Sequence, residues 1–134
     1  MEQDKLVHIA LRAEEGAALS GGSLRLYGMA DSLPVGCVDL YAYDPLNRRA
    51  AVGIMVAKEH RRRGYALAML RELELLYRGT LHNLYADIAA SNLASLTLFR
   101  TAGYAQCGLF KEWLLVDGHP VDTIRMQRTL NPLS

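Results

Sequence analysis

The residues with the clearest chemical potential lie where an apolar run meets a basic turn and a helix start. Residues 50–57 are all apolar or glycine, and residues 58–63 carry four formal positive charges against one negative. Gly64 then begins an amphipathic helix, and Ala66 keeps its first turn free of bulk. The first N–H groups of a helix lack partners within it and carry the positive end of its dipole. The basic side chains beside this start are Arg61, Arg62 and Arg63. The arrangement would bind a pyrophosphate.

Two common phosphate-binding motifs do not describe this stretch. No Lys-Ser or Lys-Thr pair follows Gly64, which excludes the nucleotide P-loop, and Gly-x-Gly-x-x-Gly is absent. What remains is Arg61-x-x-Gly64-x-Ala66 directly after a strand whose two faces are both expected to be covered. Taken alone, the same residues would also fit a basic helix start that faces solvent.

A second segment, Asn92-x-x-Ser95-x-x-Leu98-Phe99-x-x-x-Gly103-Tyr104, follows downstream. Together the two segments resemble the GNAT family of N-acetyltransferases, whose acyl-CoA loop reads Gln/Arg-x-x-Gly-x-Gly/Ala after a buried strand. The resemblance runs from about Leu24 to the end of the chain. Residues 40–45 and 113–128 look most like the subgroup that acetylates polyamines and ribosomal-protein N-termini.

The resemblance implies an α/β fold of the GNAT type: a mixed sheet that opens in a V between the strands at residues 50–57 and 81–89. It implies acetyl-CoA as donor, a primary amine as acceptor and no metal. The backbone of Ile54, Met55 and Val56 would hold the pantetheine arm and polarise the thioester carbonyl. The expected pyrophosphate ligands are Arg61, Arg62, Arg63, Gly64, Tyr65 and Ala66. The residues expected beside the rest of the cofactor are Asn92, Ser95, Phe99 and Arg100. A helix cap at Asn92 and a solvated face at Arg100 are the alternatives.

Catalysis would need a base for the amine and an acid for the leaving thiolate. Asp39, a carboxylate inside a strand pattern, is preferred to Glu59 as the base. The family's usual tyrosine acid follows the leucine of the second segment, but here Phe99 stands there and cannot donate a proton. Tyr104 is the preferred substitute, with Tyr85 and Cys107 as alternatives. If none of these residues acts as the acid, a thiol of pKa about 8.5 would leave without an acid catalyst, or the fold would bind CoA without turnover.

Hydrophobic periodicity predicts the elements that position these residues. Residues 4–17 are expected to form a weak helix. Strands are expected at 24–30, 35–43, 50–57 and 81–89, with helices at 64–78 and 93–102. Strand-like runs at 104–116 and 121–128 flank Asp117-Gly118, a strong hairpin signal. With 134 residues, the chain is expected to form a single domain over residues 1–134.

The segment before Leu24 departs from the family, which usually has a strand and two helices there to wall the acceptor site. Only some twenty residues precede it, so we expect a shortened N-terminal region. An exposed sheet edge needs pairing or burial, which predicts a homodimer. The acceptor, either a polyamine or diamine or a protein N-terminus, stays open.

Composition limits the remaining function classes. The formal charge is +1, from 15 basic and 14 acidic residues, which argues against binding nucleic acid or membranes by bulk charge. No apolar stretch approaches the roughly 18 residues of a membrane span, and residues 1–5 do not resemble a signal peptide. Cys37 and Cys107 form no Cys-x-x-Cys pair, which indicates a reducing, cytoplasmic setting without structural zinc.

Overall fold

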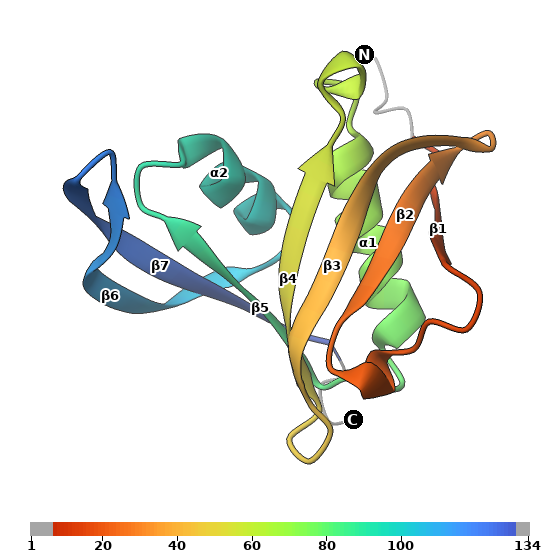
Figure 1. Ribbon diagram of the computed structural model, residues 1–134, viewed down its shortest axis with the longest axis horizontal. Helices are drawn as coiled ribbons and strands as arrows, with labels where there is room; N and C mark the ends of the chain where they lie inside the picture. Colours follow the sequence, from red (N-terminus) through yellow and green to blue (C-terminus); the bar gives the residue numbers. More distant parts are fainter. Residues whose placement is uncertain (1–6, 131–134) are drawn as a thin grey trace.

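Alternating apolar residues and turn-forming dipeptides divide most of the chain into strands. The computed structural model describes residues 7–130 and joins seven strands of that part in one sheet (Figure 1). The strands are β1 (Ala10–Ala13), β2 (Leu24–Ala30), β3 (Leu33–Asp44), β4 (Arg49–Val56), β5 (Asn83–Ala89), β6 (Ala105–Val116) and β7 (His119–Thr129). The helices are α1 (Tyr65–Tyr77) and α2 (Leu93–Thr101), with 3-10 turns at Leu19–Gly21 and Lys58–His60. The expected mixed α/β architecture is confirmed.

The sheet has the order β1-β2-β3-β4-β5-β7-β6, and only β4 and β5 pair in parallel. Parallel neighbours need a crossover connection, which α1 provides. At the other end of the chain, Asp117 and Gly118 both have positive φ, 52° and 79°, and join the paired residues Val116 and His119. This two-residue turn is the predicted hairpin.

β4 and β5 separate after a short ladder. Their parallel pairing covers Arg49 to Ala51 on β4 and Asn83 to Tyr85 on β5, and ends there. Beyond it the two strands splay toward the carboxyl end of β4, with α2 beside the opening (Figure 1). The V-shaped opening expected between these strands is therefore present.

The main core lies on one face of the sheet. Val38 and Leu40 of β3 and Val52 of β4 are buried with Met69 and Leu73 of α1, and α1 is seen behind β3 and β4 in Figure 1. The alternate residues of these strands point to the opposite face, because side chains alternate along a strand. We call this second side the open face, since no helix of residues 7–130 covers it at β2–β4. The residues on it are Arg25, Tyr27, Cys37, Asp39, Tyr41, Ala51, Gly53, Met55, Tyr85 and Asp87.

The prediction of an N-terminal helix over residues 4–17 is wrong for the part that the structure describes, which begins at residue 7. Residues 10–13 form β1 instead and pair antiparallel with β2, from Ala10 opposite Met29 to Ala13 opposite Leu26. Pairing with an available sheet edge outweighs the weak helical spacing of this segment. Within residues 7–130 a strand and one 3-10 turn, but no α-helix, precede β2, which agrees with the shortened N-terminal region expected from the sequence.

Candidate functional site

A pocket of about 560 Å³ lies at the splayed end of β4, between the N-terminal ends of α1 and α2. All but three of the residues expected to contact a cofactor line it. These are Ile54, Met55, Val56, Arg61, Arg62, Gly64, Tyr65, Ala66, Asn92 and Ser95. The fold thus brings together segments that are about forty residues apart in the sequence.

The start of α1 supplies hydrogen-bond donors to this pocket. Gly64 is the N-cap residue with φ 81°, in the left-handed region that glycine adopts without strain, and no side chain caps the helix. The first helical bond runs from the Ala68 N–H to the Gly64 carbonyl. None of the N–H groups of residues 62–67 donates to another group within residues 7–130. These unpaired donors, at the positive end of the helix dipole, fit a pyrophosphate.

The loop before α1 is fixed to the end of β4. The Arg61 Nε donates to the Val56 carbonyl at 3.1 Å, and the N–H groups of His60 and Arg61 donate to the carbonyls of Ala57 and Lys58. One of the three arginines is therefore engaged in shaping the loop. Arg62 lines the pocket, whereas Arg63 lines a neighbouring cavity on the outer side of α1.

The exposed side of β4 offers further backbone groups. The Ala57 N–H donates to the Val35 carbonyl at 2.8 Å, so alternate residues of β4 bond to β3 and the residues between them point the other way. Ile54 and Val56 belong to the second set and direct their N–H and C=O groups toward β5, which has already diverged. They face the opening, as expected for backbone that binds an extended ligand.

Asn92 caps α2 and also lines the pocket. Its side-chain oxygen accepts a hydrogen bond from the Ser95 N–H at 3.1 Å, which is the interaction expected of an N-cap residue. The cap interpretation is therefore confirmed, and Asn92 still lines the pocket beside Ser95.

Phe99 and Arg100 lie outside the lining of the pocket. Phe99 is 3% exposed and packs edge-on against Tyr104, with 4.9 Å between ring centroids, whereas Arg100 is exposed. Tyr104 is buried, and burial together with the nearby Glu74 raises the pKa of Tyr104 well above its usual range. Its hydroxyl has no hydrogen-bond partner within residues 7–130. This geometry does not support Tyr104 as the acid that protonates a leaving group in the pocket.

Asp39 lies on the open face, outside the residues that line the pocket. Both of its carboxylate oxygens accept hydrogen bonds from Arg25, at 2.7 and 2.8 Å. Its partner in register on β4 is Gly53, and the Tyr41 ring lies over this glycine, 3.7 Å from where its Cβ would stand. Glu59, the alternative base, is exposed in the 3-10 turn before α1.

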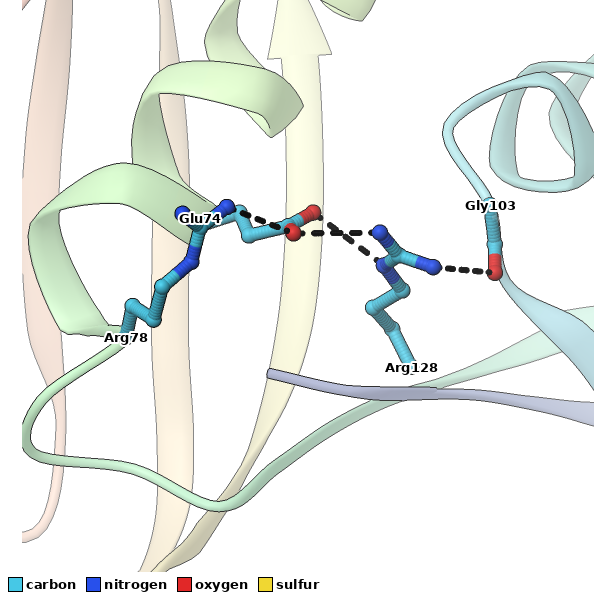
Figure 2. Close-up of polar contacts among 4 residues, drawn as sticks. All are labelled: Glu74, Arg78, Gly103 and Arg128. Carbon is cyan, nitrogen blue, oxygen red and sulfur yellow. Dashed lines mark hydrogen bonds and ion pairs between the residues drawn. The ribbon is translucent and has the colours of Figure 1, made fainter. Parts of the chain in front are cut away.

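A polar network that the sequence does not reveal ties α1 to the other half of the sheet. Glu74 accepts two hydrogen bonds from Arg128 of β7, both at 3.1 Å, and one from Arg78 at 3.2 Å (Figure 2). Arg128 also donates to the Gly103 carbonyl at 3.3 Å. Burial would raise the pKa of Glu74, but these guanidinium groups outweigh it and hold that pKa below its usual value. Glu74 and Arg128 are 54 residues apart in the sequence, so no local sequence pattern predicts their contact.

A splayed parallel strand pair, free amides at a helix start and a second helix along the pocket together define an acyl-CoA N-acyltransferase fold. The chain belongs to the acetyltransferase (GNAT) domain family, whose model matches residues 5–105. Spermidine N(1)-acetyltransferase of Vibrio cholerae is 28% identical over 95 residues, covering 69% of this chain and 54% of the relative. The chain thus spans about half the length of that curated relative.

Two solved structures share the fold. Spermidine N-acetyltransferase from Vibrio cholerae in complex with CoA and spermine has a TM-score of 0.78 at 22% identity, over 83% of this chain and 68% of that one. The ribosomal L7/L12 alpha-N-protein acetyltransferase RimL, in complex with coenzyme A, has a TM-score of 0.78 at 18% identity, over 84% and 64%.

Two features of residues 7–130 bear on other kinds of site. No helix of this part is long and apolar enough to cross a membrane. Its His, Cys, Asp and Glu side chains form no group of three or more that could hold a metal ion.

Proposed function

We propose that this chain transfers an acetyl group from acetyl-CoA to a primary amine by direct attack. The observation that carries the proposal is the row of N–H groups at residues 62–67, which donate to no group within residues 7–130 and open into the pocket at the splayed end of β4. These donors would hold the pyrophosphate, with Arg62 beside them. The acceptor is a polyamine, a diamine or a protein N-terminus.

The pocket would fix the rest of the donor. The N–H and C=O of Ile54 and the N–H of Val56 would hydrogen-bond the pantetheine amides, since the Val56 carbonyl already accepts from Arg61, and an N–H there would polarise the thioester carbonyl. Asn92 and Ser95 would contact the same arm from the opposite wall. Phe99 would support this wall from within the core, and Arg63 and Arg100 would add positive charge around the nucleotide.

In the transfer step, the neutral amine nitrogen attacks the thioester carbon, the C–S bond breaks, and CoA leaves as a thiolate. The amine proton would pass through water to Asp39, which lies across Gly53 from the opening and would exchange one of its Arg25 hydrogen bonds for that water. No tyrosine hydroxyl is needed for departure, since a thiol of pKa about 8.5 is a good leaving group near neutral pH.

Two measurements test this function. Acetyl-CoA is expected to raise the melting temperature of the protein as its concentration passes the dissociation constant. Free thiol release is then expected on adding primary amines. An unchanged melting temperature at millimolar acetyl-CoA would refute the proposed site, whereas binding without thiol release would favour a CoA-binding module that does not turn over. The buried position of Phe99 and Tyr104 is the observation behind that second function.

We also propose that two copies of the chain associate through β6. Within residues 7–130 this strand pairs only with β7, and it exposes Trp113 and Leu115, the latter 74% accessible. Such an edge favours pairing with another chain. Light scattering at tens of micromolar is expected to give a dimer, and Leu115→Lys should yield monomer. Leu46→Lys, at an 88% exposed turn position, is the matched control and should leave the dimer intact. A monomeric wild-type protein would overturn the proposal.

The remaining expectation concerns the cellular compartment of the protein. Cys37 and Cys107 are both free thiols, which suits a reducing compartment such as the cytoplasm.

A further inference from the structure

The acceptor must reach the thioester from the open face, if the proposed function holds. Met55 lines the pocket together with Ile54, yet its side chain belongs to the open face and is 55% exposed. Met55 therefore brings the edge of the pocket next to the open face, where β4 and β5 have separated. The side chains around this point decide which amine is admitted.

Both carboxylates of the open face nearest the opening are already neutralised. Asp39 is held by Arg25 at 2.7 and 2.8 Å, and Asp87 is held by Arg125 at 2.8 and 2.9 Å. Each pair is bidentate, so both oxygens of each carboxylate are engaged. Together, these two arginines and two aspartates have a net formal charge of zero.

Arg125 is also fixed by aromatic rings on two strands. Its guanidinium carbon lies 4.4 Å from the centroid of the Tyr85 ring and 5.2 Å from that of Phe110. These distances are typical of cation–π contacts, which add to the ion pair. Arg125 is therefore held in place beside Asp87, and an incoming ammonium group would have to compete with it.

A third carboxylate, Glu14, lies farther from the opening. It lines a cavity together with Arg25, Asp39 and Tyr41. Glu14 follows β1, and β2 and β3 with the Arg25–Asp39 pair stand between β1 and β4, so this pair separates Glu14 from the opening.

We infer that this face selects a primary amine on an apolar or aromatic skeleton without a second positive charge, in preference to a polyamine. A diamine or polyamine carries at least one further ammonium group, and that charge must find a carboxylate or stay hydrated. Next to the opening it meets two occupied carboxylates and the partly exposed side chains of Tyr41, Met55 and Tyr85. A single amine needs no such partner and gains from apolar contact with them. Of the two acceptor classes proposed above, the N-terminal amine fits this chemistry.

A matched pair of amines tests the inference. Hexylamine and 1,6-diaminohexane have the same carbon chain and differ only in the second amino group. We expect kcat/KM for hexylamine to exceed that for the diamine by about tenfold or more, as for one uncompensated charge at a partly exposed site. A lysine-free peptide with an apolar N-terminal residue separates a peptide acceptor from a free monoamine, and its use would support the same selection.

Two variants test whether the ion pairs cause the preference. Arg125→Gln frees Asp87 and Arg25→Gln frees Asp39, so each should raise the ratio of diamine to monoamine kcat/KM several-fold. Glu14→Gln should leave that ratio unchanged. If either variant fails to fold, the other carries the test, with circular dichroism as the check.

The outcomes separate this inference from the function on which it rests. If wild-type protein uses the diamine or spermidine as well as hexylamine, or if Glu14→Gln abolishes diamine use, the selection is overturned while acetyl transfer stands. Thiol release with none of the amines would overturn acetyl transfer itself, and with it the selection.

Discussion

Replacing Gly64 by glutamate is the most direct perturbation of the pyrophosphate site. At this position φ is 81°, and an added Cβ would meet only the Cγ2 atom of Val7, at 3.2 Å. The substitution strains the backbone and crowds Val7, but the fold should tolerate it, and the flexible side chain can bring its carboxylate in front of the amides of residues 62–67, which donate to no group within residues 7–130.

The size of the effect follows from two contributions. A side chain in the left-handed region costs about 1–2 kcal/mol of folding free energy. A carboxylate about 5 Å from each of two phosphate charges is repelled by about 1–3 kcal/mol per charge, for an effective dielectric constant between 80 and 20. The second contribution falls on binding, so the dissociation constant for CoA should rise by at least roughly thirtyfold.

Gly64→Ala is the matched control, since it carries the same backbone strain without the charge or the length. Its melting temperature should fall as much as that of Gly64→Glu, but it should keep most of its affinity for CoA. Calorimetric titration and thermal shift measure both quantities. At a hundred times the dissociation constant, CoA stabilises a protein by about 2.7 kcal/mol, or about 8–13 °C for a domain of this size. A folded Gly64→Glu protein with wild-type affinity would show that the pyrophosphate binds elsewhere.

Substitutions at three further positions test the surroundings of the site. Glu74→Gln should cost about 1–2 kcal/mol, a value reduced because Arg128 is partly exposed. In the fold the pKa of Glu74 is lowered, so the stabilisation that Glu74 gives the protein is complete above its ordinary pKa of 4.5 and is lost as the pH falls through the lowered pKa. In thermal melts at a series of pH values, Glu74→Gln should therefore show a smaller loss of stability at acid pH than the wild-type protein. Asn92→Ala should cost about 1 kcal/mol through loss of the α2 cap, and Asn92→Asp should restore the melting temperature; equal melting of all three proteins would contradict the cap. Phe99→Tyr should lower stability by about 1–3 kcal/mol, because the new hydroxyl is buried, and should not raise kcat; a tenfold rise in kcat would place the ring beside the leaving thiolate.

Much of the fold from β2 onward could be predicted because its signals are local. The Asp117-Gly118 turn, the apolar run of β4 and the apolar stripe of α1 each depend on neighbours within a few residues. The same holds for the free amides after β4, since an uncapped helix start is a property of one short segment. Most of the predicted pocket lining followed from these elements.

Features that depend on distant partners could not be predicted in this way. β1 forms because the edge of β2 is available, not because of its own four residues. Phe99 and Tyr104 are turned into the core by the packing of α2 against α1, which spacing along one helix does not specify. The bidentate pair between Arg25 and Asp39 depends on strand register, so the sequence could suggest a carboxylate at this position but not that it is occupied.

The two ends of α1 have different roles, and the helix couples one end to the other. Its first turn presents free amides to the pocket, whereas Glu74, about 15 Å further along the helix, is bonded to Arg128 on the far side of the opening. Arg128 also holds the Gly103 carbonyl, at the end of the helix whose start lines the same pocket (Figure 2). Besides the short ladder that joins β4 and β5, this network is a further link between the two halves of the sheet. Its loss should therefore alter the spacing between the amides of α1 and the wall formed by Asn92 and Ser95, and so weaken CoA binding without any contact to the ligand.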